Sequence, residues 1–111
     1  MGNWIALSRR RAIHKRDKCQ CIYCGQKVTL KYALAYWTLD HVVPRALGGS
    51  NATENLITAC PTCNKRKGKL SLMRFLHLNA NDYNPGRTVE HVLRVIAYRT
   101  GKPLDMKYQR I

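Results

Sequence analysis

Two cysteine pairs with the spacing C-x-x-C constrain the fold of this chain more than any other feature. The first pair is Cys21 and Cys24, the second is Cys60 and Cys63, and 35 residues separate the pairs. Each pair can place two thiolates on one edge of a tetrahedron, so the two pairs together satisfy a zinc ion. We therefore expect a structural zinc ion with four protein ligands, which holds the two segments side by side.

Other uses of these cysteines agree less well with the sequence. Disulfides or free buried thiols are the alternatives, but no secretion signal is recognisable near Met1, which favours a reducing, intracellular setting. A thioredoxin-like redox motif at Cys60 and Cys63 leaves the other pair without a purpose. The fifth cysteine, Cys19, can in principle replace Cys21 as a ligand. The regular spacing favours Cys21, so we expect Cys19 to be a spare thiol.

Periodicity and turn residues predict a small β-β-α unit flanked by helices. The strongest strand signal covers residues 36–43, where aromatic and β-branched side chains gather before Pro44. Pro61 suits the first turn of a helix that follows a short second strand. The predicted strands cover 36–43 and 56–59, and the predicted helices cover 3–16, 61–67, 71–78 and 88–100. The fold class is therefore α+β, with the cysteine knuckles beside the β-β-α core.

The length and patterning predict one domain over residues 1–111, with a core at about 16–77. Residues 79–111 form a C-terminal helical extension that begins with a polar linker at 79–86. The last helix is apolar along Val89, Val92, Leu93 and Ile96. We expect this face to pack on the core, and a homodimer contact is the alternative.

The charge balance indicates a polyanionic partner. The chain has 20 Lys and Arg residues against 6 Asp and Glu residues, which gives a formal net charge of +14. A surface selected only for solubility has both signs interspersed and a smaller excess. We therefore expect nucleic acid as the partner, rather than a membrane surface. No apolar stretch reaches the ~20 residues of a membrane span, so no membrane-spanning segment is expected.

Three polar residues near the predicted strands can support phosphodiester hydrolysis. Asp40 and Asn64 offer hard oxygen ligands, which suit Mg²⁺ or Mn²⁺ better than zinc. His41 can take a proton from water near neutral pH. Adjacent residues of an ideal strand point to opposite faces, so Asp40 and His41 can serve one phosphate only if the strand twists or ends there. Pro44 and the glycines at 48–49 make such an end reasonable.

The motifs D-H-x-x-P at 40–44, Asn55, and C-x-x-C-N-x-x-K-G at 60–68 resemble the HNH endonucleases of the four-cysteine subclass. The resemblance includes Arg16-Asp17 before the first knuckle and covers about residues 11–76. It implies a ββα-metal fold in which Asp40 and Asn64 bind the catalytic metal and His41 is the general base. Asn55 would hold the active-site loop and orient the histidine. The third signature position is Asn, so the chain looks like an H-N-N variant with an oxygen-liganded Mg²⁺.

The resemblance also implies a single-metal mechanism. His41 would deprotonate a water that attacks phosphorus in line, and the metal would bridge the scissile phosphate and the leaving 3′-oxygen. The products would carry 5′-phosphate and 3′-hydroxyl ends.

Basic residues near the predicted catalytic loop are candidates for contacts with DNA. Most should bind phosphates rather than bases, which gives an affinity that falls steeply with salt. Arg45 can also stabilise charge in the transition state or contact a groove. The candidates are Arg45, Lys65, Arg66, Lys67 and Lys69, together with the basic face over 9–16.

The aromatic residues Tyr32, Tyr36 and Trp37 precede the predicted catalytic strand. We expect them in the core, and a platform that stacks on nucleic-acid bases is the alternative.

Two other functions share part of this pattern. A non-catalytic zinc-knuckle DNA-binding module would make Asp40, His41 and Asn64 incidental, although such a module has no need of them. A zinc-dependent nucleobase deaminase requires His-x-Glu before Pro-Cys-x-x-Cys. The chain has no His-x-Glu, and its proline lies inside the second cysteine pair.

Overall fold

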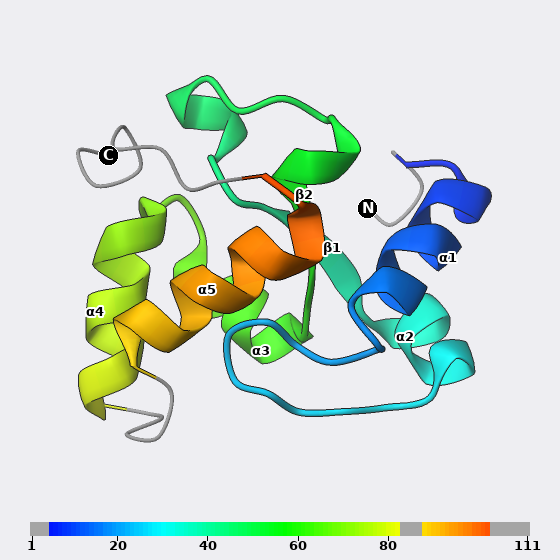
Figure 1. The fold of residues 1–111 in the computed structure, drawn as a ribbon, viewed down its shortest axis with the longest axis horizontal. Helices are drawn as coiled ribbons and strands as arrows, with labels where there is room; N and C mark the ends of the chain where they lie inside the picture. Colours follow the sequence, from blue (N-terminus) through cyan, green and yellow to red (C-terminus); the bar gives the residue numbers. More distant parts are fainter. Residues whose placement is uncertain (1–4, 83–87, 103–111) are drawn as a thin grey trace.

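The computed structural model describes residues 5–82 and 88–102, and for residues 79–82 it describes the backbone only. Within these ranges a two-stranded sheet is surrounded by helices (Figure 1). None of the described helices is long and apolar enough to cross a membrane. The helices are α1 (Leu7–Arg16), α2 (Leu30–Tyr36), α3 (Pro61–Lys67), α4 (Leu72–Asp82) and α5 (Val89–Thr100), the strands are β1 (Thr38–His41) and β2 (Leu56–Ala59), and two 3-10 turns cover Arg45–Leu47 and Thr53–Asn55.

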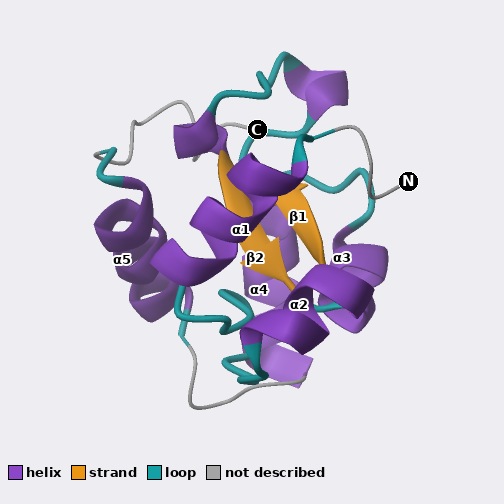
Figure 2. Ribbon diagram, turned by 90° about the vertical axis from the view of Figure 1, so that its right-hand side faces the viewer, coloured by secondary structure: helices purple, strands orange, loops and turns teal. Residues whose placement is uncertain are grey.

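The two strands pair antiparallel, with Asp40 opposite Ile57 and His41 opposite Leu56. Alternation along each strand assigns its side chains to two different layers. Leu39 and Leu56 join a small apolar cluster with Ile13 of α1. Asp40 and Ile57 therefore share the opposite face. In Figure 2, α1 crosses in front of the strands and α4 lies behind them.

The larger core lies on the face of the sheet that points away from α1. Phe75 and Leu76 of α4 and Val92 and Ile96 of α5 are each 1% exposed and belong to one cluster with Ile57. The apolar face of α5 thus packs on the core, as predicted. That packing leaves the homodimer alternative without support.

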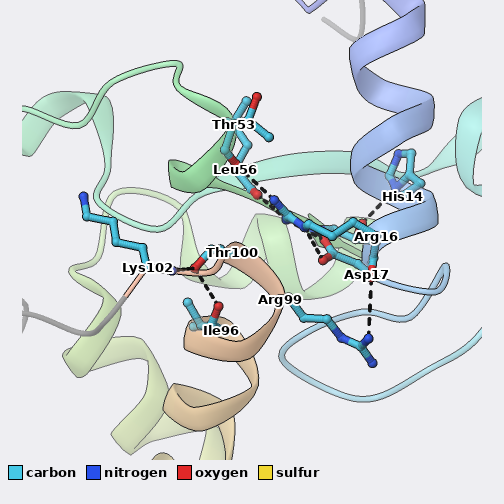
Figure 3. A network of polar contacts seen from close by, with 10 residues as sticks. His14, Arg16, Asp17, Thr53, Leu56, Ile96, Arg99, Thr100 and Lys102 are labelled. Atoms are coloured by element: carbon cyan, nitrogen blue, oxygen red, sulfur yellow. Dashed lines mark hydrogen bonds and ion pairs between the residues drawn. The ribbon is translucent and has the colours of Figure 1, made fainter.

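Polar contacts join the end of α1 to the second strand (Figure 3). The fully buried Asp17 carboxylate accepts from Arg16 at 2.8 and 3.0 Å, and from the backbone N–H of Thr58 at 2.8 Å. The Arg16 guanidinium also donates to the carbonyls of Thr53, at 3.1 Å, and Leu56, at 2.6 Å. This network fixes the segment that leads into the first knuckle against β2.

Local signals set most of the helix ends. The Thr88 hydroxyl accepts from the N–H of His91 at 3.1 Å, and Gly101 ends α5 with a φ of 72°. Ser71 likewise accepts from the N–H of Arg74 at 3.3 Å, which confirms its predicted capping role. The strand at 56–59 and the helix at 61–67 have the predicted bounds.

Other boundaries differ from the prediction. The first strand is limited to Thr38–His41, because Leu30–Tyr36 forms helix α2, which the sequence analysis missed. The Thr29 hydroxyl caps α2 by accepting from the N–H of Tyr32, and Ala33 packs into the core. Helix α4 continues to residue 82, into the predicted linker. Residues 3–4 of the predicted first helix, 83–86 of the linker and 103–111 of the extension lie outside the described residues.

Candidate active site

The four knuckle cysteines meet in one cluster, as their spacing predicted. The sulfur atoms of Cys21, Cys24, Cys60 and Cys63 all lie within 4.8 Å of one another, and those of Cys24 and Cys60 are 3.9 Å apart. Zinc–sulfur bonds of about 2.3 Å in a tetrahedron require sulfur separations of roughly 3.8 Å. The cluster therefore has the size that a four-coordinate metal ion needs.

Electrostatics within the cluster also suit a cation. Hydrogen bonds from the neighbouring thiols of Cys21 and Cys63 lower the pKa of Cys24 to about 2. A hydrogen bond from Cys21 lowers the pKa of Cys60 to about 6, against the effect of burial. At neutral pH Cys24 and Cys60 are therefore thiolates, the form in which cysteine binds metal, whereas hydrogen bonds within the cluster and burial raise the pKa of Cys21 and of Cys63. Burial, together with the charge of Asp17, raises the pKa of Cys19, which remains a thiol as expected.

Asp40 lies on β1 and is 7% exposed, so its charge is removed from most of the solvent. Its Oδ2 accepts hydrogen bonds from the hydroxyl of Tyr23 and from Nζ of Lys67, the latter at 3.1 Å. Burial raises the pKa of Tyr23 well above its ordinary value, and the negative charge of Asp40 adds to the effect. The phenol therefore keeps its proton and donates a hydrogen bond to the carboxylate.

His41 is the last residue of β1, and its Nε2 lies 2.8 Å from the side-chain oxygen of Asn51. Because an amide oxygen can only accept, this contact assigns the proton to Nε2 and the ring lone pair to Nδ1. A histidine held through Nε2 in this way has the orientation that a general base acting at Nδ1 would need. The sequence analysis missed Asn51, although its position in the glycine-containing loop was a usable signal.

Asn55 holds the loop that joins the two strands. Its Oδ1 accepts from the N–H of Val43 at 2.9 Å, and its Nδ2 donates to the carbonyls of Val43, at 3.1 Å, and Ser50, at 2.8 Å. Its side chain is therefore bonded to both ends of the loop that carries His41 and Asn51. The resemblance implied that Asn55 holds this loop and orients His41, and its role in catalysis stays a prediction.

A cavity of about 310 Å³ brings Asp40 and His41 together with three cationic side chains, those of Arg45, Lys67 and Lys69. Asp40 and His41 both belong to β1, which ends at His41, and both line this cavity. One carboxylate and one imidazole surrounded by cations form a pocket that suits a phosphate group.

The other predicted residues are placed differently. Asn64 is half-buried on α3, three residues before Lys67 and so on the same side of the helix, but it does not line the cavity. Lys65 is exposed, and the Arg66 guanidinium lies 6.0 Å from the ring centre of Phe75.

Lys67 does not fit its predicted contact with DNA phosphates. It is 1% exposed, and its Nζ is bound to Asp40 and, at 3.1 Å, to the backbone carbonyl of His41. Helix geometry contains the missed signal, since Lys67 lies four residues after the knuckle residue Cys63 and must share its inward side. Tyr23 was missed as well, although it lies between two predicted metal ligands.

Comparisons with known proteins show what this chain is similar to. The sequence model of one family, described as HNH endonuclease, matches residues 19–70. A CRISPR-associated endonuclease Cas9 from Corynebacterium diphtheriae is 44% identical over 55 residues, which are 49% of this chain and 5% of that protein. The type IV methyl-directed restriction enzyme EcoKMcrA from Escherichia coli is 29% identical over 75 residues, which cover 62% of this chain and 27% of the enzyme.

The fold also occurs in a solved structure. The crystal structure of the type II-C Cas9 enzyme from Actinomyces naeslundii superposes with a TM-score of 0.57 over 92% of this chain and 12% of that chain, at 19% identity. This match supports the fold alone. The chain spans only a small part of the length of each of these relatives.

Proposed function

We propose that this chain is a metal-dependent endonuclease that hydrolyses phosphodiester bonds in DNA, since the HNH endonuclease model matches residues 19–70. The observation that carries the proposal is the cavity in which Asp40 and His41 meet among Arg45, Lys67 and Lys69. A module that only binds DNA needs the cations but has no use for a buried carboxylate next to an oriented histidine.

Zinc is the metal proposed for the four-cysteine cluster. The donor set fits, since four sulfurs within 4.8 Å of one another match a tetrahedral site, and a site filled by four protein ligands is structural. Cys21 and Cys24 would anchor the first knuckle, and Cys60 and Cys63 the start of α3.

Mg²⁺ or Mn²⁺ is proposed for the catalytic position. Asp40 supplies a carboxylate beside the cavity, and Asn64 supplies an amide oxygen from α3, so the donors are the hard oxygens that these cations prefer. A bound divalent cation would supply charge for the scissile phosphate and the leaving oxygen.

Residues of the chain supply proton transfer, positioning and phosphate binding. His41, held through Nε2 by Asn51, accepts the proton of the attacking water at Nδ1. Asn55 keeps the loop of His41 closed, and Tyr23 keeps the Asp40 carboxylate in place. Arg45 and Lys69 bind the phosphate, and Lys65, which is exposed, binds a neighbouring phosphate of the strand. We propose 5′-phosphate and 3′-hydroxyl products.

Cleavage of supercoiled plasmid tests the proposal. The wild type is expected to relax or linearise plasmid with Mg²⁺ or Mn²⁺. His41→Ala should lower the rate by about 10²–10⁴-fold, the usual contribution of a general base. His77→Ala is the matched control, because His77 is an exposed histidine on α4. Zinc content is measured in every sample. If the wild type binds plasmid but never cuts it with any divalent metal, the chain is a DNA-binding module instead.

A further inference from the structure

Two tyrosines on α2 are exposed where the sequence predicted core residues. Tyr32 is 48% and Tyr36 is 67% exposed, whereas Ala33 and Trp37 occupy the buried side of this segment. The two rings lie one helical turn apart, with centroids separated by 4.8 Å and planes inclined by 51°. Together they present adjacent aromatic surface to solvent.

The surroundings of this pair are basic. Helix α1 packs beside α2, and the Arg10 guanidinium lies 3.5 Å from the carbonyl of Leu34, which is between the two tyrosines in sequence. Both helices lie at the end of the molecule opposite α4 (Figure 1). Arg11, Lys15 and Lys31 are exposed, and neither helix contains an acidic residue.

This combination selects one kind of partner. Exposed rings are available for stacking, and the cations favour a polyanion. Duplex DNA satisfies the cations but hides the faces of its bases within the stack. Single-stranded DNA offers both phosphates and free base faces, and proteins bind it by such a combination of a charged groove and stacking aromatics.

We propose that Tyr32 and Tyr36 form a stacking site for unpaired bases of single-stranded DNA, while the cations of α1 bind its phosphates. The inference rests on the proposed function, and it specifies the substrate as DNA with unpaired bases near the cut. Tyr36 precedes His41 by five residues, a span of about 16 Å along an extended chain. That distance corresponds to roughly five stacked nucleotides at 3.4 Å each.

Fluorescence anisotropy with a labelled ten-nucleotide oligothymidine and a duplex of equal length tests the proposal, in the absence of added Mg²⁺. The variants are Tyr32→Ala, Tyr36→Ala, their double substitution, and Tyr32→Phe with Tyr36→Phe. Tyr98→Ala is the matched control, since Tyr98 is 80% exposed on α5 and lies beside the guanidinium of Arg99. Zinc content and thermal stability establish that each variant is folded.

We expect the double alanine variant to bind the oligothymidine about tenfold or more weakly, because one stacked base contributes on the order of 1–3 kcal/mol. Its affinity for the duplex should change by less than about twofold, and its salt slope should stay unchanged, since that slope counts phosphate contacts. The phenylalanine variant and Tyr98→Ala should bind as the wild type does.

Equal losses for the oligothymidine and the duplex, or no loss for either, would overturn the proposal. So would a lower mass of the double variant in sedimentation velocity, because the tyrosines would then contact a second copy of the chain. Plasmid cleavage separates the two hypotheses. If the wild type cuts plasmid while the double variant binds oligothymidine normally, the stacking site is refuted and the nuclease stands.

Discussion

The buried ion pair between Lys67 and Asp40 gives the most decisive test of the site. The two side chains are 1% and 9% exposed, and Nζ lies 3.1 Å from Oδ2. Lys67→Met keeps most of the side-chain volume but removes the ammonium. Among the described residues, the Tyr23 hydroxyl is then the remaining side chain that donates a hydrogen bond to the carboxylate. Breaking a buried pair in this way costs about 3–5 kcal/mol, a large share of the roughly 5–15 kcal/mol by which such domains are stable.

A double-mutant cycle isolates the pair energy. The free energy of unfolding is measured by urea denaturation for the wild type, Lys67→Met, Asp40→Asn and the double variant, with zinc retained and no other divalent cation added. Each single variant leaves one buried charge without its partner, whereas the double variant leaves neither. The double variant should therefore be more stable than the sum of the single effects predicts, by about 2–3 kcal/mol.

Added Mg²⁺ extends the same test to function. In Lys67→Met a divalent cation can replace the lost positive charge beside Asp40, so Mg²⁺ should stabilise this variant more than it stabilises the wild type. At ten times its Kd, a ligand that binds only the folded state adds about 1.4 kcal/mol. Additive single effects, or equal stabilisation of both proteins by Mg²⁺, would refute the assignment of Asp40 as a charge shared between Lys67 and the metal.

Three further predictions concern the loop, a buried histidine and the metal cluster. Gly49→Ala should abolish cleavage and destabilise the fold by roughly 1–3 kcal/mol, since its Cβ would lie 1.7 Å from the carbonyl oxygen of Val43. Gly48→Asn should retain activity, because a Cβ at residue 48 has no atom within 4 Å. Plasmid cleavage assays and urea denaturation compare the two variants. Burial lowers the pKa of His14, so below pH about 6.5 the unfolded chain binds more protons than the folded chain, and the free energy of unfolding should fall as the pH drops. His14→Asn can keep the 3.0 Å contact to Thr58 and should flatten this dependence. Denaturation series from pH 5 to 8 measure it. Removal of zinc by a strong metal chelator should unfold the protein, as measured by far-UV circular dichroism. Retention of the native spectrum after zinc is removed would contradict a structural metal.

Local chemistry explains the parts of the fold that the sequence predicted. The metal cluster follows from ligand spacing alone. Helices α3 and α5 begin at residues that favour a helix start by their own chemistry. Pro61 follows the Cys60 cap at the start of α3, and the Thr88 hydroxyl caps α5. No tertiary information is needed for these features.

Tertiary packing decided the parts that the sequence did not predict. Helix α2 contains Tyr, Leu and Ala, and the sequence analysis predicted no helix there and placed Tyr36 in the first strand. Ala33 can pack against the core only as part of a helix that carries Tyr32 and Tyr36 to the outside. Likewise, the three successive cations at 65–67 differ in burial: Lys65 is exposed, Arg66 is half-buried and Lys67 is buried. The turn of α3 directs Lys67 towards Asp40 of β1.

The two knuckles also do more than form the cysteine cluster. Tyr23 lies between Cys21 and Cys24, and its hydroxyl binds Asp40. Lys67 lies one helical turn after Cys63, and its ammonium binds the same carboxylate oxygen. The two donors to the proposed metal ligand therefore come from the two segments that the four sulfurs hold together. A change at the cysteine cluster that shifts one knuckle against the other would move a donor away from Asp40, so the cluster supports the geometry of this carboxylate as well as the stability of the fold.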